Sequence, residues 1–221
     1  MLKSLIPRFK PNYNLKEWIA AFSFWRDDLS LYEKKFASKF NCSHGLMFSY
    51  GRVAIYSLLK VWGLKNSEII CPAYTCVVVP NAIVLSGNIP KFIDSEQKNY
   101  NMDIDLIEKS ISKKTGAIIV THLFGNPINA KKIESIVKKS EQKFKKKIYI
   151  IQDCAHSFQA SWESVPVTSY GDASIFGLNV SKIINSIFGG MVTTNDLKTY
   201  KKLVEFRKNE FRRSTIFSEI K

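Results

Sequence analysis

The sequence has no long apolar run, no closely paired cysteines and comparatively few acidic residues, and each absence excludes a class of protein. No stretch reaches the roughly 18 apolar residues of a membrane-spanning helix, so we expect no membrane span. Residues 1–14 are interrupted by two prolines and lack the apolar core of a signal peptide, which favours a cytoplasmic location. The cysteines form no CxxC pair, which is typical of small buried side chains and not of metal ligands or disulfides. They are Cys42, Cys71, Cys76 and Cys154.

The shortage of acidic residues leaves 19 of them against 33 lysines and arginines, a formal net charge of +14. A nucleic-acid-binding protein is expected to gather Arg and Lys together with exposed aromatic residues. Here the lysines are dispersed or follow one helix face, as in residues 130–147, which favours ordinary solvated surfaces. We therefore predict no nucleic-acid partner, although a basic surface could still attract anionic substrates.

From about residue 44 onward, apolar runs typical of strands alternate with segments of helical spacing. The strand-like runs are 44–50, 67–74, 88–95, 115–125, 146–154, 173–179 and 189–195. The helical segments are 51–65, 75–87, 102–112, 128–144 and 196–208, with Asn101 or Asp103 as one expected N-cap and Asp196 as another. This alternation predicts an α/β fold with a mainly parallel, seven-stranded sheet flanked by helices. Its 221 residues suit one sizeable domain over 41–221, preceded by a helical segment over 1–40 with helices at 15–25 and 29–40.

The polar residues of interest follow the carboxyl ends of the predicted strands, where open α/β sheets bind ligands. They lie at 51–52, 72–75, 122–125 and 152–156, and in the segment before Lys182. Lys182 stands between two strand-like runs, where an ammonium group is poorly placed for water. Asp153 ends another strand. A carboxylate there often caps a turn, and a single histidine such as His156 is usually structural.

The pairing of Asp153 with Lys182 changes this interpretation, because pyridoxal phosphate requires these two groups. A lysine forms a Schiff base with the aldehyde of the cofactor. An aspartate keeps the pyridine nitrogen protonated, so that the ring accepts electrons. The phosphate needs a helix N-terminus, and the stretch SYGRVAIYSLL at 49–59, with Gly51 at its turn, has that form.

Residues 41–210 resemble the large domain of the DegT-type nucleotide-sugar aminotransferases, a branch of the fold-type-I pyridoxal phosphate enzymes. The matching stretches are CPAYTCVVVPNAI, GNIPKFIDSEQKNYNMDIDLIEKSISKKTGAIIVTHLFGNP, IQDCAHS and GDASIFGLNVSKIINSIFGGMVTTND. The resemblance implies that Lys182 carries the cofactor and moves protons, that Asp153 pairs with the pyridinium and that His156 lies near the phenolic oxygen. It also implies cofactor-binding positions at Gly51, Arg52 and Asn179, and no metal ligands.

The chain departs from the family pattern at three positions near the cofactor. Tyr50-Gly51-Arg52 replaces Ser-Gly-Thr, Gly177 replaces a phosphate-binding Ser, and Cys76 replaces a stacking aromatic residue. Family members also continue into a small C-terminal domain. We therefore expect this sequence to represent the large domain alone, and to act as a homodimer or with a partner chain.

The resemblance implies a transferase that aminates a keto group of a nucleotide-linked sugar for cell-surface polysaccharide or related amino-sugar biosynthesis, with glutamate as the expected amino donor. A related dehydratase is an alternative, but those relatives carry His where this chain has Lys182. A truncated non-catalytic homologue or partner subunit is a further alternative, supported by Gly177 and Cys76.

Overall fold

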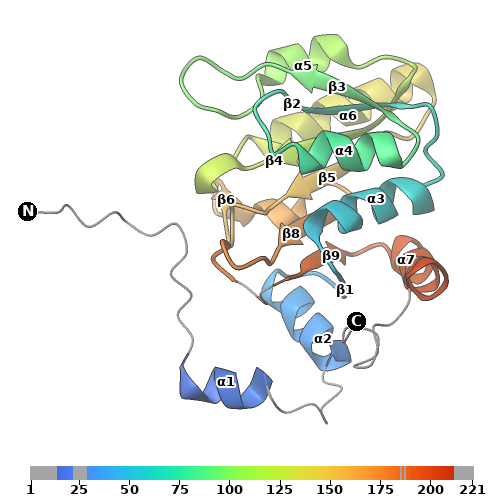
Figure 1. Cartoon of the computed structure of the whole chain (residues 1–221). Coiled ribbons are helices and arrows are strands. Elements are labelled where there is room, and N and C mark those ends of the chain that lie inside the picture. The colour runs from blue at the N-terminus through green and yellow to red at the C-terminus, as the bar shows by residue number, and fades with distance from the viewer. Residues whose placement is uncertain (1–13, 22–28, 185, 187, 212–221) are drawn as a thin grey trace, which may run out of the picture.

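Seven strands form one sheet in the computed structural model, which describes residues 14–21, 29–184, 186 and 188–211 (Figure 1). Across the sheet the strand order is β1-β9-β8-β5-β4-β2-β3. The bounds are β1 His44–Phe48, β2 Glu68–Pro72, β3 Ile89–Ile93, β4 Thr115–Thr121, β5 Tyr149–Asp153, β8 Ala173–Gly177 and β9 Gly190–Thr194. Neighbouring strands run parallel from β8 to β3, and β9 is antiparallel to both β8 and β1. The prediction of a mainly parallel seven-stranded sheet is confirmed.

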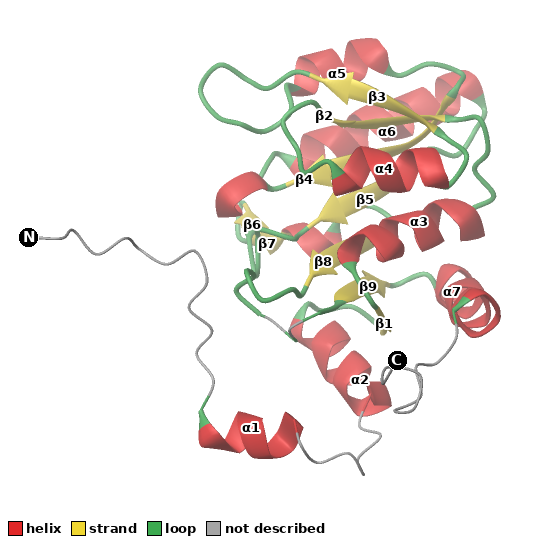
Figure 2. Cartoon of the chain, viewed as in Figure 1, coloured by secondary structure: helices red, strands yellow, loops and turns green. Residues whose placement is uncertain are grey.

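Helices cover both faces of this sheet, so the protein has three layers (Figure 2). One face carries α3 (Gly51–Val61), α4 (Val78–Leu85) and α7 (Leu197–Glu210). The other carries α2 (Leu29–Lys39), α5 (Ile104–Ser110) and α6 (Ala130–Phe144), while α1 (Leu15–Ala21) is drawn apart from the layers. Side chains alternate between the faces: in β4, Ala117 and Ile119 join the first core, and Ile118 and Val120 the second.

Several boundaries differ from the predicted ones. The run 115–125 leaves the sheet after Thr121, and Leu123–Gly125 form a short 3-10 turn. A small ribbon of β6 (Ser161–Trp162) and β7 (Val165–Pro166), with a 3-10 turn at Val167–Ser169, was not predicted. Asp103, not Asn101, caps α5. Asp196 caps α7 as predicted. Residues 22–25 of the first predicted helix lie outside the described residues.

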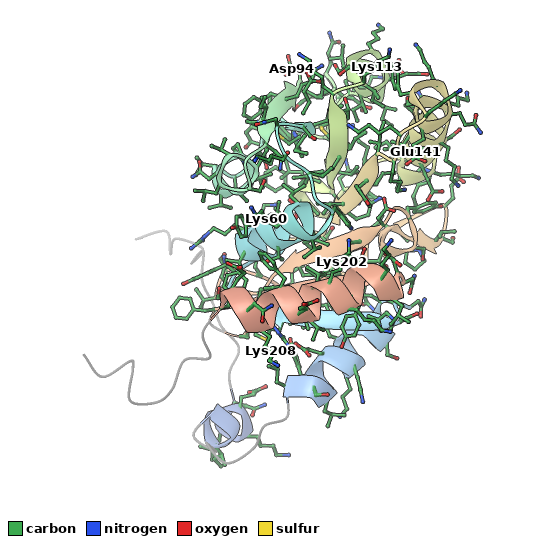
Figure 3. The ribbon with its side chains drawn as sticks, turned by 90° about the vertical axis from the view of Figure 1, so that its right-hand side faces the viewer. Lys60, Asp94, Lys113, Glu141, Lys202 and Lys208 are labelled. Atoms are coloured by element: carbon green, nitrogen blue, oxygen red, sulfur yellow. The ribbon has the colours of Figure 1, made fainter. Side chains whose placement is uncertain are left out.

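Exposed lysines extend from several elements of the described surface. Figure 3 labels exposed examples on α3 (Lys60), after α5 (Lys113) and on α7 (Lys202 and Lys208). Among the described helices, none is both long and apolar enough to cross a membrane.

The first turn of α3 lies directly against the start of β9. A Cβ atom built on Gly190 would stand 2.3 Å from the backbone nitrogen of Gly51 and 2.3 Å from the carbonyl carbon of Tyr50. Real Cβ atoms do not approach backbone this closely, so only glycine fits at position 190. This contact places the N-terminus of α3 over the sheet edge.

Replacing Gly190 by Ala should therefore destabilise the fold. The new methyl group meets backbone atoms, which cannot rotate away, and overpacking of this kind costs at least about 2 kcal/mol of the free energy of unfolding. Urea unfolding measures the change. Gly177→Ala is the matched control, because its Cβ would meet its nearest neighbour at 3.4 Å, and it should cost much less. Equal losses in the two variants would contradict the close-contact explanation.

Candidate cofactor site at the carboxyl edge of the sheet

A cavity of about 170 Å³ lies at the carboxyl ends of β4, β5 and β8, beside the N-terminus of α3. All six residues that the sequence singled out line it: Gly51, Arg52, Asp153, His156, Asn179 and Lys182. The three positions that depart from the family pattern, Tyr50, Gly177 and Cys76, line the same cavity. The residues predicted to lie at one edge of the sheet therefore line a single cavity.

Asp153 ends β5 at the floor of this cavity and is only 4% exposed. Its Oδ1 accepts the backbone N–H of Ala155 at 3.0 Å, and its Oδ2 accepts the Thr121 hydroxyl at 3.2 Å. Burial raises the pKa of the Asp153 carboxyl, an effect that these two hydrogen bonds and the nearby charges of Lys182 and His156 oppose. A buried carboxylate so placed favours a cationic ligand above it.

Lys182 lies in the segment between β8 and β9, and a turn that begins at Asn179 positions it. The Lys182 backbone N–H donates to the Asn179 carbonyl at 2.9 Å. The Asn179 Oδ1 accepts the Ser181 N–H at 3.0 Å and the Ser181 hydroxyl at 2.6 Å. The Lys182 side chain passes over Gly177, where a built Cβ would stand 3.4 Å from its Cε atom. A methyl group at position 177 would therefore be in ordinary van der Waals contact with the lysine stem.

Gly51 and Arg52, the first residues of α3, line the cavity, so the positive dipole end of this helix lies beside it. Tyr50 is the N-cap and its side chain makes no capping hydrogen bond. The Arg52 guanidinium lies 4.0 Å from the centre of the Tyr50 ring, a cation–π contact that keeps its charge at the start of the helix. This end of α3 suits an anion such as a phosphate group.

His156 follows β5 by three residues and lines the cavity from an exposed position. Its imidazole stacks on the Phe124 ring, with ring centres 5.8 Å apart and planes 12° apart. Partial burial and the positive charge of Lys182 lower the pKa of His156, while Asp153 opposes the shift. The neutral ring can accept or donate a hydrogen bond at the cavity wall.

Comparison with known proteins identifies the chain. Residues 22–219 match the model of the DegT/DnrJ/EryC1/StrS aminotransferase family. The chain belongs to this family.

Members of the family with assigned activities are similar to the chain over much of its length. A GDP-perosamine synthase of Escherichia coli O157:H7 is 30% identical over 214 residues, covering 91% of this chain and 56% of that protein. A dTDP-4-amino-4,6-dideoxy-D-glucose transaminase of Shigella dysenteriae is 29% identical over 177 residues, covering 80% of the chain and 46% of that protein. The chain thus spans about half the length of these relatives.

Solved structures of other proteins share the fold of this chain. PseC of Helicobacter pylori, an aminotransferase of pseudaminic acid biosynthesis, superposes with a TM-score of 0.83 at 21% identity, covering 96% of this chain and 58% of that one. A GDP-4-keto-6-deoxymannose-3-dehydratase with a trapped PLP-glutamate adduct gives 0.82 at 24% identity, covering 91% and 54%. At these identities the likeness establishes the α/β fold of the family's large domain.

Two features of the site escaped the sequence reasoning. Thr121 donates to Asp153, and the register that pairs these two residues across β4 and β5 could have indicated it. Thr75, within the predicted strand-end segment 72–75, lines the cavity as well. Cys76 is exposed there, so the expectation of buried cysteines is wrong for this one, whereas Cys42, Cys71 and Cys154 are buried. Cys76 follows β2 in a loop, where apolar neighbours do not imply burial.

Behind the cavity, His122 is fully buried between the end of β4 and the next loop. Its Nδ1 accepts the Ile128 N–H at 3.2 Å, so its Nε2–H donates to the Gln152 Oε1 at 2.9 Å. This neutral tautomer joins the loop to β5 one residue before Asp153. Burial lowers the pKa of His122 to about 4, and the hydrogen bond to Gln152 opposes the shift.

The buried neutral ring predicts a loss of stability in acid. Between pH 6.5 and 4 the unfolded chain binds a proton at His122 and the folded chain does not. The free energy of unfolding therefore decreases as the pH falls through this range. A pKa change from 6.5 to about 4 amounts to about 3 kcal/mol. Urea unfolding of the wild type and of His122→Gln should show this excess loss in the wild type alone. Parallel pH dependences would contradict the assignment.

Proposed function

We propose that residues 41–221, with the segment 1–40 before them, form the cofactor-binding part of a pyridoxal phosphate-dependent aminotransferase. The acceptor is a keto group of a nucleotide-linked sugar, the amino donor is glutamate, and the product serves polysaccharide or related amino-sugar biosynthesis. One observation carries the proposal: a buried carboxylate, a lysine and a helix N-terminus surround a single cavity. Family membership and the sugar-nucleotide relatives support it.

The residues present fit pyridoxal phosphate in charge and in position. Asp153 is a buried acceptor with two hydrogen-bond donors on its inner side, and it would hold the pyridinium nitrogen. The first amides of α3, at Gly51 and Arg52, would bind the phosphate. His156 and Asn179 stand at the wall and would bind the remaining polar edge of the ring. When bound, the cofactor supplies an electron sink for the amino carbon of the substrate.

Two side chains of the chain itself, Lys182 and Asp153, would take part in the chemistry. The Lys182 amine would attach to the cofactor when it is bound and would move a proton at the amino carbon of the substrate. Asp153 would hold the ring nitrogen in its positively charged form, because a carboxylate with little access to water interacts strongly with a cation beside it.

A homodimer or a complex with a partner chain, and a cytoplasmic location, belong to the same proposal and rest on the family resemblance. Gly177 and Cys76 favour a second candidate, a non-catalytic homologue that keeps the fold. The lysine at position 182 argues against the alternative that the chain is a dehydratase.

Covalent trapping tests the central assignment. After incubation with pyridoxal phosphate and borohydride reduction, peptide mapping should find the cofactor on the peptide that contains Lys182. Lys182→Met should abolish the label, because Lys182 is the lysine that lines the cavity among the described residues. Lys60→Met, an exposed lysine of α3 (Figure 3), is the matched control and should keep the label. A label elsewhere would refute the assignment, and no specific label would favour the non-catalytic homologue.

The role of Asp153 is tested by Asp153→Asn. The amide still accepts from Ala155 but cannot stabilise a positive ring nitrogen, so conversion of glutamate to 2-oxoglutarate with bound cofactor should fall about a hundredfold or more. Labelling of Lys182 should persist. Asp94→Asn, an exposed residue after β3 (Figure 3), is the control for the same chemical change. Undiminished conversion by Asp153→Asn would remove the residue from its proposed role.

A further inference from the structure

Three aromatic rings stand exposed together at the carboxyl edge of the sheet, next to the cavity. Tyr74 is 52% exposed, Tyr100 60% and Phe124 64%. Tyr74 and Tyr100 have ring centres 5.3 Å apart, and Phe124 lies 5.9 Å from Tyr100 and 6.5 Å from Tyr74. Phe124 also stacks on His156, which lines the cavity. We call Tyr74, Tyr100 and Phe124 the aromatic trio.

The trio comes from three different loops, which follow β2, β3 and β4. Exposed aromatic rings are unfavourable in water, and a cluster of them marks a binding surface more often than a single ring does. Since the three loops leave the same sheet edge as the cavity, the trio extends the cavity wall outward.

The protein holds the Phe124 ring in the open by a fixed and strained backbone. Phe124 has φ 55° and ψ 23°, the left-handed region that a phenylalanine rarely adopts. Asn101, only 4% exposed, accepts the Leu123 N–H at 3.0 Å and donates to the Asn126 carbonyl at 2.9 Å. One buried side chain thus secures both sides of the strained residue, and it also adjoins Tyr100. Strain that the surroundings enforce in this way is typical of functional sites.

We propose that the aromatic trio is the stacking surface for the base of the nucleotide-linked substrate. This inference rests on the proposed function, in which the sugar enters the cavity and its nucleotide remains outside. Aromatic faces stack on any base. The sugar-nucleotide relatives are named for GDP, dTDP and UDP compounds, whose bases share a flat face but differ in their hydrogen-bonding edges. A surface of rings binds what these bases have in common.

The test measures binding of GDP and UDP to the full chain loaded with pyridoxal phosphate, with inorganic pyrophosphate as a probe that lacks a base. Phe124→Asn removes the ring and keeps a residue that tolerates the left-handed region. It should weaken GDP and UDP binding about tenfold, as loss of a stacking ring does, and leave pyrophosphate binding unchanged. Tyr74→Ser should act in the same direction. Phe92→Ser, which removes a ring of equal exposure (52%) from β3, is the matched control and should change nothing.

Asn101→Ala tests whether the trio is prearranged. It keeps all three aromatic residues but removes the hydrogen bonds that hold the backbone on both sides of Phe124. It should therefore also weaken GDP and UDP binding and leave pyrophosphate binding unchanged. Labelling of Lys182 by borohydride is read in the same samples. Its loss in the wild type would refute the proposed function, whereas intact labelling with unaltered nucleotide binding in the trio variants would overturn only this inference.

Three further outcomes would also overturn it. The wild type could fail to bind GDP and UDP, or the trio variants could weaken pyrophosphate as strongly as the nucleotides. Alternatively, the trio variants could change only the oligomeric state in sedimentation experiments, which would assign the rings to contact with a second copy of the chain.

Discussion

The backbone contact between Gly190 and the start of α3 is the constraint on which the site depends. Gly190 pairs with Phe48 of β1 on one side and with Gly177 of β8 on the other. Tyr50 and Gly51 lie directly against it. This single glycine touches both the strand before α3 and the strand before the Lys182 segment. It therefore fixes the position of the N-terminus of α3 relative to Lys182. A side chain there would separate the two halves of the cavity.

Opposite that contact, the electrostatics of the site are determined by burial. Asp153 has lost most of its water, and its carboxylate accepts hydrogen bonds from Ala155 and Thr121. Burial raises the pKa of Asp153 and lowers that of His156, so both groups are shifted toward their neutral forms. The nearby charges of Lys182 and His156 oppose the shift at Asp153, and a ligand that brings a positive nitrogen to this carboxyl would favour its charged form further.

Much of this arrangement was predictable from the sequence, because parallel strands bring their carboxyl ends to one edge. The order of strands and helices, and the positions of Asp153 and Lys182 after buried strands, were sufficient to place six residues on one cavity. The predicted ends of some strands were wrong, because they were inferred from apolar composition. The run 115–125 reads as one strand, but His122 turns inward to bond Ile128 and Gln152, and the chain leaves the sheet there. The contact with Gln152 joins residues far apart in the sequence, and no local pattern predicts it.

The aromatic trio was missed for a related reason, since exposure of a ring depends on the loop that carries it. Tyr74 and Phe124 each sit in a largely apolar stretch that would suit a core, and Tyr100 is a single aromatic residue in the polar stretch 95–101. What exposes Phe124 is the left-handed backbone, which Asn101 secures from another loop. At this edge, the groups that suit a cofactor lie on strand ends and on the N-terminus of α3, which the sheet holds in place. The loops above them form surfaces that in general differ from one protein to another, and we expect substrate preference to depend on them. Asn101 bonds the loop after β4 from the loop after β3, and His122 bonds that same loop to Gln152 of β5, so both join the aromatic trio to the sheet edge.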